Sequence, residues 1–215
     1  MHANCQAGNR KMIPLLPLSS YFVKMQLLGV ILCGGESKRM GSDKGLTPIH
    51  NTIWALAMAD KLSFLECPVV FSVNKNQFIT YSAFISPADL VEDNYDTSGP
   101  TRGLLTVHNR FPDKDIFLLS CDMLELDEFT IRQMLGVYQE ESDYDYYAYQ
   151  DKEYAQPFCG IYTSRGLDRL QELIRSEDLV SISMQYVLNN GFTKRLTIEH
   201  KNAFRNFNYK EHNME

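Results

Sequence analysis

Short, nearly continuous apolar runs alternate along the chain with longer segments in which apolar residues recur at helical spacing. An unbroken apolar run too short for a typical helix indicates a strand that is buried on both faces of a sheet. The predicted strands cover residues 27–32, 68–73, 88–92, 115–121, 144–150 and 153–162, the third being the weakest.

The segments between these runs predict helices. Helical spacing is found in residues 51–65, 101–110, 125–139, 165–175 and 180–189, with a looser helix or turn in residues 75–82. Asn51 or Thr52 is the expected N-cap of the first helix. The helix in residues 125–139 is expected to turn four side chains inward: Phe129, Met134, Leu135 and Tyr138. The alternation of strands and helices predicts an open, mainly parallel α/β sheet in three layers, with helices on both faces.

The loop after the first strand combines paired glycines with cations. Gly34 and Gly35 allow main-chain N–H groups to approach a ligand closely, and Lys38, Arg39 and Lys44 add three positive charges. A run of N–H groups forms an anion-binding concavity, and Arg and Lys neutralise phosphate charge. The loop therefore predicts a site for a chain of phosphates, the alternative being a solvated glycine turn with unrelated surface charge.

Two common phosphate-binding motifs are excluded. A Walker loop requires Lys directly after its second glycine, whereas Gly41 is followed by Ser42, Asp43 and then Lys44. The dinucleotide fingerprint G-x-G-x-x-G is also absent.

The pattern that fits is L-x-G-G-x-S-x-R-M-G-x-D-K-x-L, which runs from Leu32 to Leu46. It resembles the signature loop of nucleotidyltransferases that join a nucleoside monophosphate to a phosphorylated acceptor, most closely the molybdenum cofactor guanylyltransferases of the MobA type. The resemblance implies a Rossmann-like nucleotidyltransferase fold. It also implies that Arg39 and Lys44 are catalytic, and that four loop residues bind the nucleotide: Leu32, Gly34, Gly35 and Lys44.

A second segment, residues 97–103, also resembles this family. Ser98 is a suitable cap and Pro100 suits the first turn of the helix that follows. The family's G-P-L-A-G motif, which follows an acidic residue, implies nucleotide contacts from Asp93, Gly99 and Gly103. Arg102 replaces a small residue of that motif, which either alters the base contact or adds a cation near the nucleotide. The segment could also be an ordinary capped helix start.

Asp122 stands at the end of the strand in residues 115–121, the edge where open α/β sheets bind ligands. Mg²⁺ takes one or two carboxylates together with phosphate oxygens. The resemblance to the family's C-D-x-P motif implies that Asp122 holds Mg²⁺, although Met123 and Leu124 follow without the proline. A helix cap is the alternative.

Near the C-terminus, Asn206 and Asn208 would project from one face of an extended segment, roughly 6.6 Å apart. Two amides offer both donors and acceptors to a heterocycle such as a pterin. The family has N-x-N here on its molybdopterin side, whereas related cytidylyltransferases tend to have D-x-D-T. Two polar residues in a terminal turn are the alternative.

Composition narrows the partners. The net charge of −6 and pI near 5.4 argue against broad binding to nucleic acid or an anionic membrane, and no apolar stretch is long enough to span a bilayer. The five cysteines contain no C-x-x-C pair, which favours small buried residues in a reduced, cytoplasmic compartment. Residues 1–24 are expected to be an appended leader and residues 25–215 one domain.

Taken with these motifs, the resemblance implies transfer of GMP from GTP to the phosphate of molybdopterin, with release of pyrophosphate and dependence on Mg²⁺. Other molybdenum cofactor proteins and molybdoenzymes are the implied partners. A cytidylyltransferase, a sugar-phosphate nucleotidyltransferase and a non-catalytic nucleotide- or cofactor-binding paralogue remain alternatives.

Overall fold

The computed structural model describes residues 26–34, 43–152 and 154–205. Within these residues seven strands form the main sheet, in the order β5-β4-β1-β6-β8-β7-β9, and two short strands form a separate hairpin. The strands are β1 (Leu27–Leu32), β2 (Pro48–Ile49), β3 (Thr52–Ile53), β4 (Val69–Val73), β5 (Leu90–Glu92), β6 (Asp115–Ser120), β7 (Tyr146–Asp151), β8 (Tyr154–Tyr162) and β9 (Thr193–Thr197).

The main sheet is parallel except at one strand. β5, β4, β1 and β6 run parallel, and β7 runs parallel to β9. β8 is antiparallel to both of its neighbours, β6 and β7. The prediction of a mainly parallel α/β sheet is therefore confirmed.

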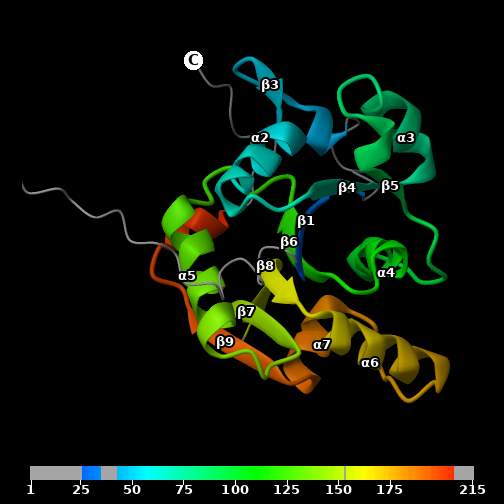
Figure 1. Cartoon of the computed structure of the whole chain (residues 1–215), viewed down its shortest axis with the longest axis vertical. Coiled ribbons are helices and arrows are strands. Elements are labelled where there is room, and N and C mark those ends of the chain that lie inside the picture. The colour runs from blue at the N-terminus through cyan, green and yellow to red at the C-terminus, as the bar shows by residue number, and fades with distance from the viewer. Residues whose placement is uncertain (1–25, 35–42, 153, 206–215) are drawn as a thin grey trace, which may run out of the picture.

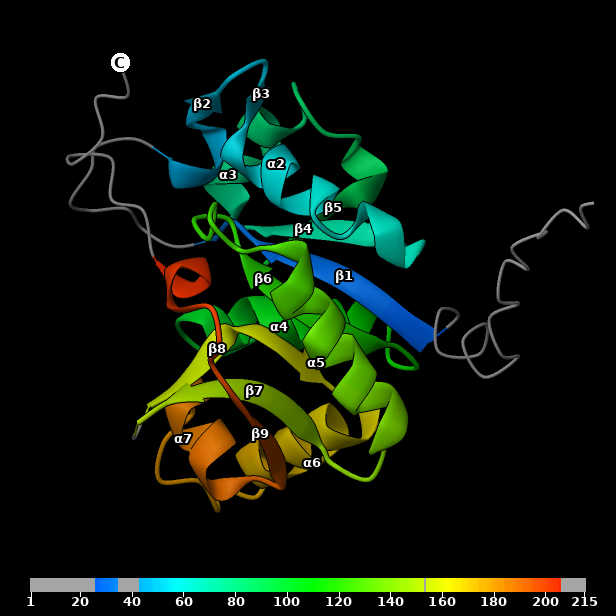
Figure 2. The same cartoon turned by 90° about the vertical axis from the view of Figure 1, so that its left-hand side faces the viewer.

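Helices cover both faces of this sheet, as Figures 1 and 2 show. Successive residues of a strand point to opposite faces. Leu27 and Ile31 of β1 thus belong to the core under α2, α3 and α5, whereas Leu28 and Val30 belong to the core under α4, α6 and α7. The helices are α2 (Trp54–Asp60), α3 (Lys75–Tyr81), α4 (Pro100–Arg110), α5 (Glu128–Glu140), α6 (Ser164–Arg175) and α7 (Met184–Asn190).

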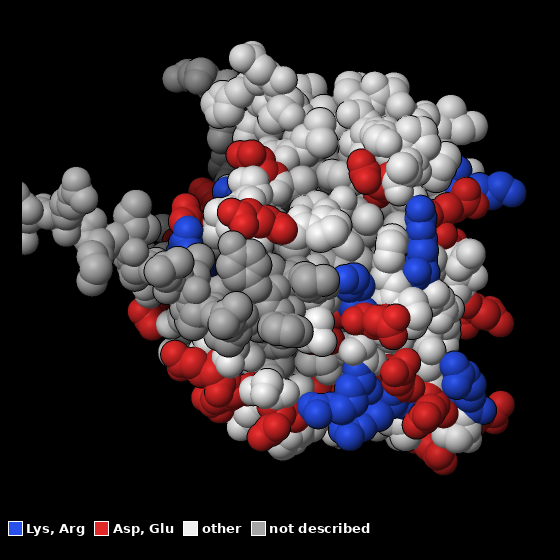
Figure 3. All heavy atoms as spheres, viewed as in Figure 1, with Lys and Arg blue, Asp and Glu red and all other residues white. Residues whose placement is uncertain are grey.

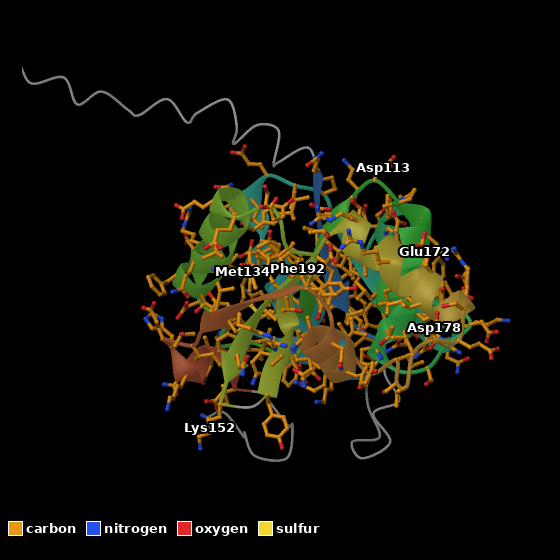
Figure 4. The ribbon with its side chains drawn as sticks, turned by 90° about the horizontal axis from the view of Figure 1, so that it is seen from below. Asp113, Met134, Lys152, Glu172, Asp178 and Phe192 are labelled. Carbon is orange, nitrogen blue, oxygen red and sulfur yellow. The ribbon has the colours of Figure 1, made fainter. Side chains whose placement is uncertain are left out.

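The apolar runs become the most deeply buried strands. Every residue of β1 is buried, as are the four residues of β6 from Ile116 to Leu119, which supports the two-face burial inferred from their composition. Figure 4 shows the buried Met134 of α5 well inside the molecule, whereas the exposed Lys152, between β7 and β8, lies at its periphery.

The predicted helix in residues 51–65 is wrong at its start. Thr52 and Ile53 form β3 and pair with β2, and the helix begins only at Trp54. Neither Asn51 nor Thr52 caps it, because the N-cap is Ile53 and makes no side-chain cap bond. The hairpin overrides the local capping preference.

Two further details differ from expectation. The side chain of Phe129 does not face the core but is 47% exposed and stacks on His200, whereas Met134 and Tyr138 are buried as predicted. The N-cap of α4 is Gly99, with φ of 69°, and not Ser98. Because this φ lies in the left-handed region, glycine is favoured there.

The strand β9 was not predicted. Its sequence, Thr-Lys-Arg-Leu-Thr, contains a single buried residue, Leu196, so it has no apolar run. It is held at the edge of the sheet by pairing with β7.

The segment 1–24, predicted to be a leader, lies outside the described residues. No helix among the described residues is long and apolar enough to cross a membrane. Basic and acidic side chains are interspersed on the face in Figure 3, where the described residues form no continuous basic field.

Candidate functional site

The predicted site residues that the structure describes lie at the carboxyl ends of parallel strands. Gly34 follows β1, Asp93 follows β5 and Asp122 follows β6. The chain moves from β1 through β4 to β5 on one side, then crosses to β6 on the other, so the strand order reverses at β1. Ligands of open α/β sheets bind in the crevice at such a switch point.

A cavity of about 590 Å³ opens at this edge. Five of the predicted binding residues contribute to its lining, and Arg102 joins them, which supports an added cation at this position. The complete lining consists of Leu32, Gly34, Ser72, Asn74, Lys75, Asn76, Asp93, Ser98, Gly99, Pro100, Arg102 and Gly103.

Two glycines allow the close packing around Asp93. A Cβ on Gly34 would lie 2.7 Å from Asp93 Oδ2, and one on Gly103 would lie 2.3 Å from Ser72 Oγ. The N–H of Gly34 donates to the Ser72 carbonyl at 3.1 Å. This N–H is therefore bonded to β4, contrary to the expectation that it faces phosphate. What Gly34 provides is room for the Asp93 carboxylate to pack against the backbone.

Asp93 is a perturbed carboxylic acid in the cavity wall. Burial raises its pKa to about 6, against opposing contributions from the Ser72 hydrogen bond and the Arg102 charge. Ser72 Oγ donates to Asp93 Oδ1 at 2.6 Å. Near neutral pH, Asp93 is consequently available in its ionised form as a hydrogen-bond acceptor at the cavity.

Lys44 and Asp122 meet across the switch point. Lys44 Nζ donates to Asp122 Oδ2 at 2.8 Å, and Ser120 Oγ donates to Asp122 Oδ1 at 2.6 Å. The two charged side chains are 25% and 13% exposed, respectively. This contact joins the segment after β1 to the end of β6. It brings together a cation and a carboxylate that are 78 positions apart in the sequence.

The donor set suits Mg²⁺ bound largely by substrate oxygens. No group of three or more His, Cys, Asp or Glu side chains that could hold a metal ion is found in the part of the chain that the structure describes. A single carboxylate such as Asp122 fits an ion whose other ligands are phosphate oxygens and water. The family's proline position is occupied here by Leu124, which is partly buried against the core, and the intervening Met123 is 3% exposed.

Sequence reasoning missed the cavity wall formed by Ser72 and the start of α3. Asn74 Oδ1 accepts from the N–H groups of Asn76 and Gln77, while Gln77 Oε1 accepts from the N–H of Asn74. This reciprocal pair is a capping box, and the N-x-x-Q spacing after a strand was the available signal. With this signal, residues 75–82 would have been predicted as a helix with a defined start at Asn74, instead of a loose helix or turn.

Four predicted site residues, Gly35, Arg39, Asn206 and Asn208, lie outside the described residues.

The structure is an open, mainly parallel α/β fold with the glycine-lined cavity and the Lys44–Asp122 contact at one edge of its sheet; neither Lys44 nor Asp122 is among the residues that line the cavity. Solved structures share this fold. The molybdopterin-guanine dinucleotide biosynthesis protein A of Archaeoglobus fulgidus has a TM-score of 0.63 at 16% identity, covering 80% of this chain and 84% of that one. A cytidylyltransferase from Leptospira borgpetersenii has a TM-score of 0.58 at 12% identity, over 80% and 75% of the two chains.

The sequence comparison gives the family. The model of the MobA-like NTP transferase domain matches residues 29–189, and the chain belongs to this family. It is also 26% identical over 183 residues to a molybdenum cofactor guanylyltransferase of Campylobacter jejuni, covering 85% of this chain and 91% of that protein. The class is therefore that of the nucleotidyltransferases.

Proposed function

We propose that this protein transfers GMP from GTP to the terminal phosphate of molybdopterin and releases pyrophosphate. The observation that carries the proposal is the placement of the Lys44–Asp122 contact at the same sheet edge as the cavity containing Asp93. Family membership and the name of the Campylobacter relative supply the reaction and its acceptor.

In the proposed reaction an oxygen of the molybdopterin phosphate attacks the α-phosphorus of GTP. A phosphorus–oxygen bond forms to that oxygen, the bond between the α-phosphorus and the bridging oxygen breaks, and its electron pair leaves with pyrophosphate. The attacking phosphate is already ionised, so no general base is required. Phosphoryl-type transfer depends on alignment and charge neutralisation, which the protein can supply without covalent help.

Each side of the site has its own role in this proposal. The nucleoside occupies the cavity, where Asp93 accepts hydrogen bonds and Gly99 and Gly103 permit close approach. Lys44 and Arg39 neutralise charge on the departing pyrophosphate. Asp122 would hold Mg²⁺, which neutralises phosphate charge when bound.

The acceptor side is proposed from the sequence pattern alone. Asn206 and Asn208 would bind the pterin ring through their amides. Asn206→Ala should then raise the KM for molybdopterin while GTP affinity stays nearly unchanged. Calorimetric titration with GTP beside acceptor kinetics measures both quantities, and an equal loss of both would place Asn206 elsewhere.

The working unit in this proposal is residues 25–215, with residues 1–24 as an appended leader. A cytosolic setting is proposed as well, with other molybdenum cofactor proteins as partners. Four cysteines of the described part, Cys33, Cys67, Cys121 and Cys159, are free thiols, as is common in a reducing compartment.

The test is a nucleotide panel. The protein is incubated with molybdenum-loaded pterin, Mg²⁺ and each of GTP, CTP, ATP and UTP, and pyrophosphate release is measured. We expect release with GTP. Release only with CTP would favour the cytidylyltransferase alternative, and no release with any nucleotide would favour a non-catalytic paralogue.

A further inference from the structure

Directly before Lys44, the carboxylate of Asp43 is held by three donors. Its Oδ1 accepts from the Gly45 N–H at 3.0 Å and from the Tyr81 hydroxyl at 2.7 Å. Its Oδ2 accepts from Gln77 Nε2 at 2.6 Å. Two of these donors, Gln77 and Tyr81, come from α3, so this helix holds the residue directly before Lys44.

Gln77 also reaches the end of β1. The same Nε2 donates to the Cys33 carbonyl at 3.0 Å, while Oε1 accepts from the Asn74 N–H at 2.8 Å. The side chain is 9% exposed and uses both amide protons and its oxygen. One buried amide thus connects the residue after β1, the residue before Lys44 and the N-terminus of α3.

Tyr81 fits against the chain with little free space. A Cβ on Gly45 would lie 2.1 Å from the tyrosine oxygen, so the backbone after Lys44 rests on this hydroxyl. Tyr81 is fully buried, and burial raises its pKa far above the ordinary range. The hydroxyl therefore stays protonated and remains a donor to Asp43.

These contacts involve the residues directly before and after Lys44. Asp43, directly before Lys44, accepts hydrogen bonds from the Gly45 N–H, directly after it, and from the Tyr81 hydroxyl, and the Lys44 ammonium group donates to Asp122. The first turn of α3, in contrast, lines the cavity with Asn74, Lys75 and Asn76. The helix therefore touches the nucleotide cavity at one end and fixes the lysine through Gln77 and Tyr81.

We propose that Gln77 and Tyr81 are positioning residues that hold Lys44, through Asp43, where it meets the β- and γ-phosphates of the nucleotide. This inference rests on the proposed function. A long, flexible lysine loses side-chain entropy when it binds phosphate, and a fixed backbone reduces what must be ordered on binding. Loss of either residue should weaken contacts to the terminal phosphates and spare those to the nucleoside.

The experiment compares GTP with GMP by isothermal titration calorimetry in the presence of Mg²⁺. The variants are Gln77→Met, which keeps the length but removes the amide, and Tyr81→Phe, which removes one oxygen. Gln171→Met and Tyr149→Phe are matched controls, because these buried side chains hydrogen-bond to Asn109 and to Thr130 and Gln133. Thermal unfolding of all four variants measures the structural cost.

We expect GTP affinity to fall about tenfold in Gln77→Met and several-fold in Tyr81→Phe, with GMP affinity close to wild type. In the controls the ratio of GTP to GMP affinity should stay unchanged. Equal losses for both nucleotides, or an unchanged ratio in Tyr81→Phe, would show that these residues only stabilise the fold.

The same titration separates this inference from the proposed function. If the wild-type protein binds GTP no more tightly than GMP, the proposed triphosphate site itself is wrong. If the wild type prefers GTP and Tyr81→Phe keeps the full preference, only the positioning role is wrong. The Tyr81→Phe variant tests the positioning role even if Gln77→Met does not fold.

Discussion

Two lysine–carboxylate contacts of similar length lie in regions of different kind. Lys44 meets Asp122 at 2.8 Å where parallel strands end, and Lys194 meets Glu141 at 2.6 Å between β9 and the end of α5. The carboxylate is 13% exposed in the first contact and 45% exposed in the second. The Lys194–Glu141 pair therefore lies at the surface, where an ion pair contributes little to stability.

The polar groups of the two regions differ in the same way. In the region with β7 and β8, hydroxyls are directed at protein acceptors: Tyr146 donates to the Gly166 carbonyl, Tyr149 to Thr130 and Tyr162 to Pro157. Around β1, β4 and β5, Asp93 is bonded to Ser72 but also lines the cavity. The comparison indicates that position at the carboxyl ends of strands, more than the geometry of a contact, distinguishes the candidate site from structural polar groups.

The largest difference is expected between the alanine variants of the two lysines. Lys44→Ala should lower turnover by about 10²–10³-fold, because a positioned cation no longer balances the developing pyrophosphate charge. Lys194→Ala should leave turnover unchanged. Steady-state kinetics with GTP and molybdopterin measures both. Similar turnover in the two variants would remove the distinction between the regions.

Two glycines provide the next comparison. Gly103→Ala should destabilise the protein by about 1–3 kcal/mol, since the new methyl group would lie 2.3 Å from Ser72 Oγ and push α4 away from the cavity. Gly136→Ala, in α5, meets no atom within 4 Å and should stabilise by about 0.5–1 kcal/mol. Urea unfolding gives both free energies, and a Gly103→Ala protein as stable as wild type would mean that α4 can move freely.

The pH dependence of stability tests the burial of Asp93. Its pKa of about 6 exceeds the ordinary value of 3.8, so between these values the folded state binds more protons than the unfolded state. This carboxyl therefore lowers the free energy of unfolding as pH rises through that interval.

The variant Asp93→Asn cannot ionise. Its free energy of unfolding minus that of the wild type should therefore rise by about 1–2 kcal/mol between pH of about 4 and about 7, after allowance for partial solvent screening. Asp113→Asn, at an exposed position near the periphery in Figure 4, is the control for loss of a charge. Unfolding in urea at several pH values provides the measurement. A flat difference for Asp93→Asn would contradict the raised pKa.

The smallest effect is expected in the tyrosine-rich region. Tyr149→Phe removes a hydroxyl that donates to the Thr130 carbonyl at 2.7 Å and should cost about 1 kcal/mol of stability. Turnover should stay at the wild-type level, because Tyr149 does not line the cavity and its hydroxyl is bonded within the protein, to Thr130 and Gln133. A large loss of turnover with unchanged stability would give this region a part in the reaction.

The chain by itself determined those features that depend on neighbours in sequence. The apolar runs gave β1, β4 and β6 because burial on both faces requires a nearly unbroken apolar strand. The positions of Gly34, Asp93 and Asp122 just after strands were likewise readable, since parallel strands end at a common edge.

Tertiary structure alone decided the features that depend on distant segments. The β2–β3 hairpin and the polar strand β9 form through pairing that no periodicity reveals. The bonds from Gln77 and Tyr81 to Asp43 span 34 and 38 positions of sequence, and Lys44 reaches Asp122 across 78. A hydrogen bond depends on distance and angle in space, and the sequence order of its partners specifies neither.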